Sequence, residues 1–483
     1  MQAPASVTTQ RTTPPSGVAT DGFRELLEAA AVGARQLDGD GVLSLALPLP
    51  LRDPLALLGQ LEGGDRFRFL WDGAPGLCLA ASGRSNSLEL SGPRRFELTQ
   101  RFSAVCLSRL AAPQDCPPLA RPRLLLAFSF FDSPLQEGEG MAGVQAVLPR
   151  WQLSRQGRHC WLRLQRTLGG DVTARSLAEE LWEQAERLAR LPADPDALGD
   201  GGGGPAIRHR SAWEPGYRAV VERGLELVEG GALRKLVLAV RQELLLDQPL
   251  DPLRLLAQLR QRQPGSCRFL WQRGAGPALL GASPERLLTV RQGQLRSDAL
   301  AGTAPVGPAA ALLTSSEKDR REHELVVDAI SATLAEAGLC PRRPRHPRLA
   351  RHGQLVHLHT PITAALGQQQ PLALAGALHP TPAVAGLPRR EAMAALRSLE
   401  PFERGFYAAP IGWIDSAGDA ELRVAIRSGS LHGQRLELTA GAGLVRGSQP
   451  ERELQEVALK LGVLQQQLNL DSHPLERPRH PVA

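Results

Sequence analysis

Lysine is scarce in this chain, which makes the few lysines candidates for chemistry. The 483 residues include 56 lysines and arginines, of which only Lys235, Lys318 and Lys460 are lysines. Arginine can replace lysine wherever a solvated cation is enough, but its guanidinium stays protonated and cannot serve as a titratable amine. The three lysines therefore indicate positions that need an amine, although chance survival of any one of them stays open.

Lys235 and Glu285 could act as a base and an acid. Lys235 opens the run KLVLAV and shares one face of the expected strand with Val237 and Ala239, so burial could keep its amine neutral. Glu285 follows a Ser-Pro turn at the end of a strand-like run, where a partly buried carboxyl can keep its proton. Such a pair on opposite sides of a substrate suits displacement of a hydroxyl by water. The alternative is a surface lysine and a turn glutamate.

Two expected helices carry carboxylates that could hold a metal ion. On the first, 315–338, Glu322 lies on the apolar stripe, where a carboxylate is costly unless it meets a cation. On the second, PERELQEVALKL, Glu453, Glu456 and Lys460 share one face at spacings i, i+3 and i+7. A few carboxylates completed by water and substrate suit Mg²⁺. The alternative for the second helix is a surface ion pair between Glu456 and Lys460.

Three further features could line a site for an anion. Arg427 is expected on the strand LRVAIRSG, and TAGAGLV at 439–445 is expected to form a tight turn. A forked guanidinium and backbone N–H groups beside glycine both bind carboxylates. His379 lies between apolar neighbours in the loop LHPTPAVAGLP.

Composition argues against several classes of protein. The net charge is +6, but the positive residues are spread along the chain and aromatic residues make up only 4%, which disfavours nucleic-acid binding. No run approaches the roughly 18 apolar residues that would span a bilayer. Six scattered cysteines without paired spacing indicate free, mostly buried thiols and a cytoplasmic location.

The tetrapeptide RFLW occurs twice, at 68–71 and at 268–271. Both copies continue through a Gly/Ala/Pro turn into an apolar strand, but only the later copy reaches a carboxylate, Glu285. The earlier copy reads Ser82-Gly83-Arg84, for which we expect a scaffold role and a solvated Arg84. The repeat predicts two halves related by duplication, with chance repetition as the alternative.

We therefore expect an α+β fold of two pseudo-repeated halves, whose antiparallel sheets pack together with helices on the outside as one body. The predicted organisation is a disordered tail (1–21), an N-terminal half (22–190), a Gly/Pro/Asp linker (191–205), a catalytic half (206–470) and a flexible tail (471–483). Hydrophobic periodicity predicts helices over 22–36, 172–190, 214–231, 252–263 and 315–338, and strands over 42–50, 66–71, 76–82, 87–92, 124–130 and 232–246.

Several motifs in a fixed order resemble one family. LAGTAPVG, EKDRREHELVVDAI, HPTPAVAG, RGFYAAPIGWID, AIRSG, TAGAGLV and PERELQEVALKL are similar to motifs of the chorismate-utilising enzymes, which include isochorismate, anthranilate, aminodeoxychorismate and salicylate synthases. The resemblance is dense over about 210–466 and weaker over 22–190. It implies a single chorismate-binding body.

The resemblance also implies a role for each matching residue. Lys235 matches the base that activates water, and Glu285 the acid that protonates the departing hydroxyl. The implied Mg²⁺ ligands are Glu322 and Glu456, with Glu453 and Asp319 beside them. The implied substrate-binding residues are Arg427, Gly441 and Lys460 for the chorismate carboxylates, and His379, Thr303 and Tyr407 for the same pocket. No role is implied for Lys318.

Three positions separate the members of the family. Lys235 is typically not lysine in the members that use ammonia, and Ala301 precedes Gly-Thr in the motif where aminodeoxychorismate synthase carries a nucleophilic lysine. Ala383 stands where the members that expel pyruvate have threonine. This pattern resembles isochorismate synthase, which converts chorismate to isochorismate, and the long N-terminal half favours menaquinone or phylloquinone synthesis.

The alternatives are salicylate synthase, an isochorismate synthase of siderophore synthesis, an ammonia-using synthase with a glutaminase partner, and a catalytically silent chorismate-binding homologue. The preferred interpretation implies that the chain has no glutaminase subunit and no nucleic-acid or membrane partner. It also implies a monomer or a weak dimer.

Overall fold

A computed structural model describes residues 18–37, 41–73, 76–133, 142–192, 205–274 and 276–467. The predicted tail 471–483 therefore lies wholly outside the described residues, and the predicted linker 191–205 lies almost wholly outside them. Of the predicted tail 1–21, residues 18–21 belong to a helix, so the helix predicted from residue 22 begins at Val18.

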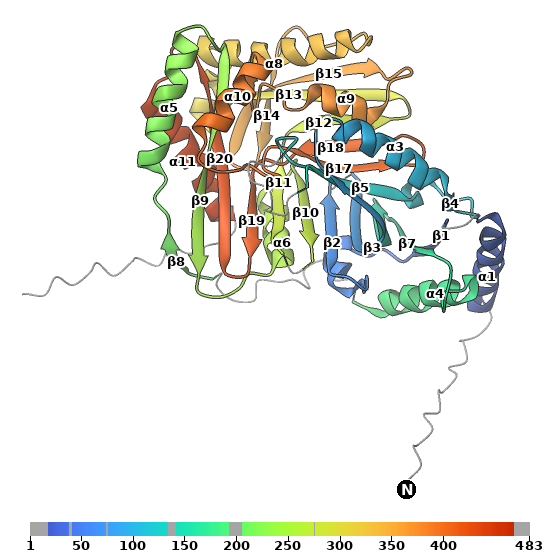
Figure 1. The fold of residues 1–483 in the computed structure, drawn as a ribbon. Coiled ribbons are helices and arrows are strands. Elements are labelled where there is room, and N and C mark those ends of the chain that lie inside the picture. The colour runs from blue at the N-terminus through green and yellow to red at the C-terminus, as the bar shows by residue number, and fades with distance from the viewer. Residues whose placement is uncertain are drawn as a thin grey trace, which may run out of the picture.

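Helices and mainly antiparallel strands make up the fold, which confirms the α+β prediction (Figure 1). The helices are α1 Val18–Gln36, α2 Pro54–Leu57, α3 Arg95–Ser108, α4 Ala174–Arg190, α5 Glu214–Glu229, α6 Pro252–Arg262, α7 Pro308–Leu312, α8 Glu317–Glu336, α9 Pro371–Leu378, α10 Arg389–Leu399 and α11 Pro450–Gln467, with short 3₁₀ turns at Leu58–Gln60 and Pro118–Ala120.

The strands are β1 Val42–Leu49, β2 Phe67–Asp72, β3 Cys78–Leu90, β4 Leu110–Ala111, β5 Arg123–Phe128, β6 Val144–Gln156, β7 His159–Thr167, β8 Ile207–Arg210, β9 Lys235–Leu246, β10 Cys267–Arg273, β11 Ala278–Ser283, β12 Arg286–Arg291, β13 Gln294–Pro305, β14 Arg348–His352, β15 Leu355–Ala365, β16 Gly386–Leu387, β17 Pro410–Asp415, β18 Ala420–Val424, β19 Ser428–His432 and β20 Arg435–Val445.

The two RFLW copies pair directly with each other. Strand β2 runs antiparallel to β10, with Leu70 opposite Leu270 and Phe69 opposite Trp271. From this centre the order continues as β3, β6, β7 and β1 through the N-terminal half, and as β11, β19, β20 and β9 through the other. Strand β17 also pairs with β5, so strands from both halves form one continuous structure (Figure 1). The division at 191–205 therefore stays a prediction.

An aromatic cluster fills the space beside this central pair of strands. Phe67 and Phe69 meet the Trp271 ring edge-on, at centroid distances of 5.2 and 5.9 Å. Trp71 and Trp413 are buried in the same cluster. Both copies of the repeat thus contribute aromatic rings to one core, and aromatic contacts of this kind add to the energy of area burial.

The repeat copies differ where the strand after the turn ends. In the earlier copy β3 continues to Leu90 through a bulge between Arg84 and Asn86. In the later copy β11 stops at Ser283, because Pro284 has no N–H with which to continue the ladder. Arg84 is not solvated as predicted: it pairs with Asp65 at 2.8 Å and lies over the Phe67 ring.

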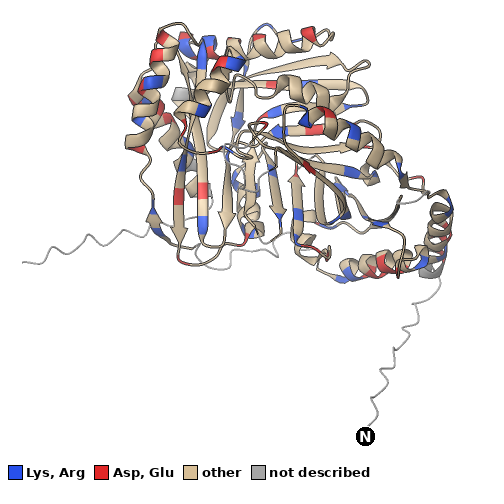
Figure 2. Ribbon diagram, viewed as in Figure 1, with Lys and Arg blue, Asp and Glu red and all other residues tan. Residues whose placement is uncertain are grey.

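Local sequence signals explain where several helices begin and end. Ser316 caps α8 by accepting a hydrogen bond from the Asp319 N–H, and Thr173 forms a capping box with Ser176 on α4. Helix α5 has proline in its first turn and a glycine cap at Gly230. In Figure 1 the helices lie outside the strands, and Figure 2 shows acidic and basic residues interspersed over both halves.

Two predictions of local structure are wrong. The segment 439–445 is not a tight turn but part of the long strand β20, in which Gly441 pairs with Ala239 and Gly443 with Val237. Arg427 is not on a strand: it lies between β18 and β19 with φ +52°, in the left-handed region.

Within the residues that the structure describes, no helix is long and apolar enough to cross a membrane. The six cysteines are free, as predicted.

We predict that Asp72→Asn destabilises the fold, because buried Asp72 joins the two halves. Its carboxylate accepts from Arg268 at 2.9 Å and from Arg260 at 2.6 Å. Removing one partner of a buried ion pair leaves an uncompensated charge and costs about 3–5 kcal/mol, measured as a fall in the free energy of unfolding in urea. The control is Asp65→Asn, whose partly exposed pair with Arg84 should cost less than about 1 kcal/mol. Equal losses in both variants would contradict the interpretation.

Candidate active site

One cavity collects most of the residues predicted for the site. Its walls come from β9, β13, β20, α8, α11, the β11–β12 connection and the segment 404–408. The predicted residues that line it are Glu285, Thr303, Glu322, Ala383, Tyr407, Arg427, Gly441, Glu456 and Lys460. Strands and helices far apart in the sequence therefore converge there, which is the arrangement expected of an active site.

Lys235 lies behind this cavity rather than on its surface. Its side chain is buried, and Nζ donates to Glu322 Oε1 at 2.9 Å. Burial is the largest influence and raises the pKa of Glu322, but the charge and hydrogen bond of Lys235, together with the charges of Lys318 and Lys460, lower that pKa overall. The prediction that Glu322 must meet a cation is therefore confirmed, and the cation is the candidate base itself. The contact suits an ammonium, so the sequence prediction of a neutral amine at 235 stays untested.

A glycine on β20 makes room for this ion pair. A Cβ atom at Gly443 would lie 2.7 Å from Glu322 Oε1 and 3.2 Å from Lys235 Cε. Both distances are shorter than ordinary van der Waals contacts, so any larger residue would displace the pair. The glycine in TAGAGLV therefore serves close packing within a strand and not a turn.

A second cation and carboxylate lie on α11. Lys460 Nζ donates to Glu456 Oε1 at 2.6 Å and to the Gly441 carbonyl oxygen at 2.7 Å. This pair is not the surface pair weighed as the alternative, because both side chains line the cavity and bridge α11 to β20. It provides a second charged wall.

Glu285 contributes the third carboxyl, and none of the cations in the described part of the chain is bonded to it. The Ser283 hydroxyl accepts from the Glu285 N–H at 3.2 Å and donates to the Val424 carbonyl at 2.6 Å, which fixes the turn. Thr381 Oγ1 donates to the carboxyl at 3.4 Å. Burial raises the pKa of Glu285 to about 7, although Lys235 and Thr381 lower it in part.

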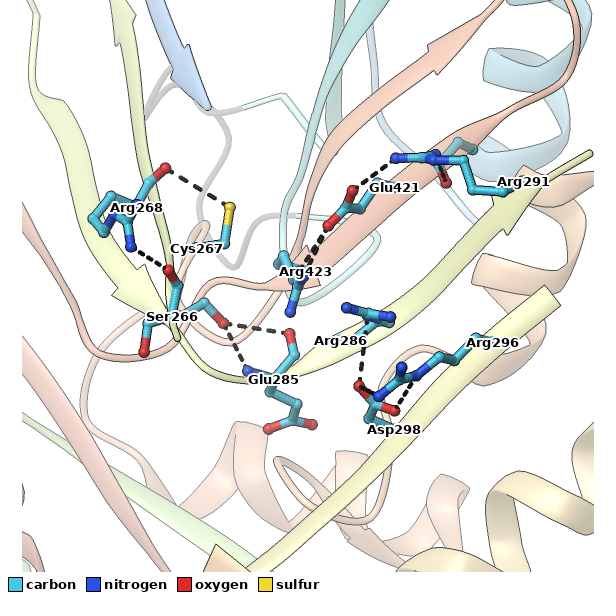
Figure 3. Close-up of polar contacts among 12 residues, drawn as sticks. Ser266, Cys267, Arg268, Glu285, Arg286, Arg291, Arg296, Asp298, Glu421 and Arg423 are labelled. Carbon is cyan, nitrogen blue, oxygen red and sulfur yellow. Dashed lines mark hydrogen bonds and ion pairs between the residues drawn. The ribbon is translucent and has the colours of Figure 1, made fainter. Parts of the chain in front are cut away.

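The arginines near Glu285 are already paired with other carboxylates. Arg286 and Arg296 contact Asp298, and Arg423 contacts Glu421 (Figure 3). In Figure 3 the Glu285 carboxyl points away from these pairs. A carboxyl that can hold a proton near pH 7 is therefore built into the wall of the cavity.

His357 is a cavity residue that the sequence analysis missed. Burial lowers its pKa well below the usual value, so the ring is neutral. Its Nε2 accepts from Arg427 Nη2 at 3.2 Å, which places the proton on Nδ1 near Thr303 Oγ1 (3.2 Å) and the Gly302 carbonyl (3.1 Å). His357 thus orients Arg427. The sequence signal that could have identified it is the run HLHTP on β15, whose first histidine, His357, faces inward.

Arg404 was also missed, although it stands in the motif RGFYAAP. It is buried against Glu400, with Arg404 Nε 2.7 Å from Glu400 Oε2, and donates to the carbonyl oxygens of Val384 and Val237 at 2.7 Å each. Glu400 in turn accepts from the Ala239 N–H at 2.8 Å. This pair fastens β9, which carries Lys235, to the segment that carries Thr381.

Besides Lys235, three predicted site residues lie outside the cavity wall. His379 packs against Phe130, whose carbonyl oxygen bonds its ring, and it therefore lines a different cavity. Glu453 is buried and pairs with Lys318 at 2.7 Å. Asp319 lies beside Gly302, near the start of α8. Lys318, which had no predicted role, therefore connects α8 to α11.

Comparison with known proteins agrees with this geometry. The family described as chorismate binding enzyme matches residues 25–469 of the chain. The chain belongs to the chorismate-binding enzymes.

Relatives of this chorismate-binding enzyme are similar over most of its length. A salicylate biosynthesis isochorismate synthase from Pseudomonas aeruginosa is 33% identical over 474 residues, which cover 94% of this chain and 97% of the relative. Isochorismate synthase DhbC from Bacillus subtilis is 38% identical over 270 residues, covering 53% of this chain and 68% of the relative. The structure of MenF, the menaquinone-specific isochorismate synthase from Escherichia coli, superposes with a TM-score of 0.73 at 26% identity, covering 92% and 99% of the two chains.

The carboxylates of this chorismate-binding enzyme are compatible with a magnesium ion. Among the described residues, no three His, Cys, Asp or Glu side chains are grouped as a ready-made metal site. Mg²⁺, however, commonly takes one or two protein carboxylates and completes its shell with water and substrate. Glu322 and Glu456 line one cavity and supply such a pair of oxygen donors.

We predict that the free energy of unfolding falls less between pH 5 and pH 8 in Glu285→Gln than in the wild type. The folded carboxyl has a pKa near 7 against 4.5 for the ordinary group, so the folded state holds the proton more tightly and loses stability as the pH rises between these values. Glutamine does not titrate, so the variant should lack a loss of about 2–3 kcal/mol in the free energy of unfolding between pH 5 and pH 8. Urea unfolding at both pH values measures this difference. Glu421→Gln is the control with the opposite sign, because Arg423 and Arg291 lower the pKa of Glu421 against burial. No difference between wild type and Glu285→Gln would contradict the raised pKa.

Proposed function

We propose that this chain is an isochorismate synthase, which converts chorismate to isochorismate and depends on Mg²⁺. The observation that carries the proposal is one cavity with a proton-holding carboxyl, Glu285, on one side and the Lys235–Glu322 pair on another. The names of the relatives above support the same reaction.

Substrate carboxylates would bind to the cationic walls. Arg427 is half-buried at the cavity wall and presents a forked donor oriented by His357, and Lys460 projects from α11. Burial raises the pKa of Tyr407 to about 12, so its hydroxyl stays neutral and can donate a hydrogen bond. Thr303 and the Gly441 backbone complete the pocket in this proposal. These groups would hold the ring in one orientation.

In the reaction, Lys235 takes a proton from a water molecule whose oxygen forms a bond to ring carbon C2. The ring double bonds shift, the bond from C4 to its hydroxyl breaks, and Glu285 gives its proton to the departing group, which leaves as water. The atoms balance, since one water is added and one is lost. A raised pKa suits Glu285 to the acid role, because much of the carboxyl is protonated near neutral pH.

The base role requires a change of partner in the site. Lys235 can accept a proton only as a neutral amine, whereas its contact with Glu322 at 2.9 Å suits an ammonium. We therefore propose that Glu322 turns from Lys235 toward the metal when the site is loaded. Glu322 and Glu456 would hold Mg²⁺, which when bound neutralises a substrate carboxylate. Glu453 and Asp319 would support these two residues from outside the cavity.

The reaction would stop at isochorismate. Ala383 lines the cavity and provides no hydroxyl where the pyruvate-releasing members have threonine. One of the relatives above is named for salicylate biosynthesis and another as menaquinone-specific, so the quinone pathway predicted from the sequence stays a prediction. Salicylate synthase and a silent homologue are the alternatives that experiment must separate.

The test is incubation of the purified full chain with chorismate and Mg²⁺, with chromatographic separation of the products. Isochorismate without pyruvate is the expected result, and EDTA should abolish its formation. Pyruvate would identify salicylate synthase. An aminated product on adding ammonium would identify an ammonia-using synthase, and no turnover would leave the silent homologue.

We predict that Lys235→Ala and Glu285→Gln each reduce turnover by about 10²–10⁴-fold, because each removes one proton-transfer group. Chorismate and Mg²⁺ binding, measured by calorimetry, should persist. Glu97→Gln is the control, because Glu97 lies on the surface paired with Arg94 and should leave turnover unchanged. Normal turnover in either active-site variant would refute the assigned roles.

A further inference from the structure

A second cavity lies between α3, α9, α10 and the segment that follows β5. Four arginines line it: Arg95, Arg389, Arg390 and Arg397. One carboxylate, Asp132, also lines it and contacts Arg397 at 3.8 Å. The described wall of this cavity therefore carries an excess of positive charge.

The most buried of these arginines is held by neutral groups. Arg95 donates to the Ser129 hydroxyl at 3.2 Å and to the carbonyl oxygens of Phe130 and Phe131. Burial lowers the pKa of Arg95 to about 10, so it remains charged at neutral pH. Arg389, which is partly buried, donates to the Leu378 carbonyl at 3.3 Å. Buried and partly buried cations held by neutral hydroxyl and carbonyl groups favour an incoming anion.

The same cavity has flat apolar walls. Phe96, Phe130, Phe131 and Met393 line it, and the Arg397 guanidinium lies 4.1 Å from the centre of the Phe131 ring. Such walls fit a ring rather than an inorganic ion, because aromatic side chains bury flat apolar surface well.

His379 adds a hydrogen-bond acceptor. Its Nε2 lies 3.1 Å from the Phe130 carbonyl oxygen, which can only accept, so Nε2 carries the proton. Its Nδ1 is buried and has no partner among the described residues. Burial, together with Arg95, lowers the pKa of His379 well below its usual value, so the ring is neutral. Because His379 lines the cavity, its unpartnered buried acceptor calls for a hydroxyl or N–H donor on the bound molecule.

We propose that this second cavity binds a cyclic carboxylate that also carries a hydroxyl group. The carboxylate would meet the arginines, the ring would lie against the phenylalanines, and the hydroxyl would donate to His379 Nδ1. No covalent change is involved.

The site also has a short connection to the catalytic cavity. Thr381, two residues after His379, donates to Glu285 at 3.4 Å. A ligand bound at His379 can therefore shift the segment that holds the proposed acid, so the second cavity is suited to regulation of the rate. The binding claim itself does not depend on the proposed function.

The experiment is calorimetric titration of the EDTA-treated full chain with 3-hydroxybenzoate. Arg389→Gln/Arg397→Gln should bind the probe at least about tenfold more weakly than wild type, since two charge-assisted contacts are lost. Arg94→Gln removes one positive charge beside the cavity but not from its wall and should bind within about twofold of wild type. Benzoate, which lacks the hydroxyl, should bind at least about threefold more weakly than 3-hydroxybenzoate.

Arg427→Gln separates the two cavities, because it alters only the first and should leave this binding unchanged. Loss of binding in Arg427→Gln, unchanged binding in Arg389→Gln/Arg397→Gln, or no heat at millimolar probe would overturn the proposal. Equal affinity for benzoate would overturn the role of His379. If the double variant does not fold, Arg390→Gln replaces it, because that arginine is exposed, and the expected loss is about threefold.

A change in kcat on adding the probe, absent from the arginine variant, would support regulation, and binding without that change would overturn it. A chain that binds the probe but does not convert chorismate would refute the proposed function and leave the second site intact.

Discussion

The buried ion pair between Lys235 and Glu322 is the constraint on which the rest of the site depends. A fully buried ammonium is costly unless a carboxylate compensates it, so β9 and α8 must meet at this point. Gly443 is required because a side chain there would occupy the same space. Arg404 and Glu400 then fix β9 against the loop that carries Thr381. The neighbouring elements thus pack so that this pair stays buried and satisfied.

Lys235 and Glu285, the proposed base and acid, have opposite environments. Lys235 is bonded to a carboxylate, whereas Glu285 is buried without a bonded cation among the described residues, and its pKa rises to about 7. The nearby arginines could have held Glu285 ionised, but Asp298 and Glu421 already occupy them. Because these arginines are paired with other carboxylates, they do not stabilise the ionised form of Glu285. Separating the environments of two groups in this way is how one site supplies both an acid and a base.

The two RFLW copies continue differently in the sheet, which accounts for an acid in only one of them. Pairing of β2 with β10 places both copies side by side in the centre of the molecule, where their aromatic residues build one core. In the earlier copy β3 continues past the turn and pairs with β6, so the chain there is used for the sheet. In the later copy Pro284 ends the ladder, and the freed backbone turns Glu285 toward the cavity.

Some features were determined by the sequence itself. Helical periodicity located α4, α5, α6 and α8, because amphipathic spacing and capping residues are local properties. The scarcity of lysine and the order of the motifs selected most of the cavity residues, since residue types restrict chemistry without reference to geometry. Close packing was not readable in this way: the glycines of TAGAGLV resembled a turn, yet they belong to strand β20, where a side chain at Gly443 would meet Glu322 and Lys235. The partner of Lys235, the orientation of His379 into a second cavity and the part played by His357 were decided only by the tertiary structure, because burial and charge pairing depend on segments that are distant in the chain.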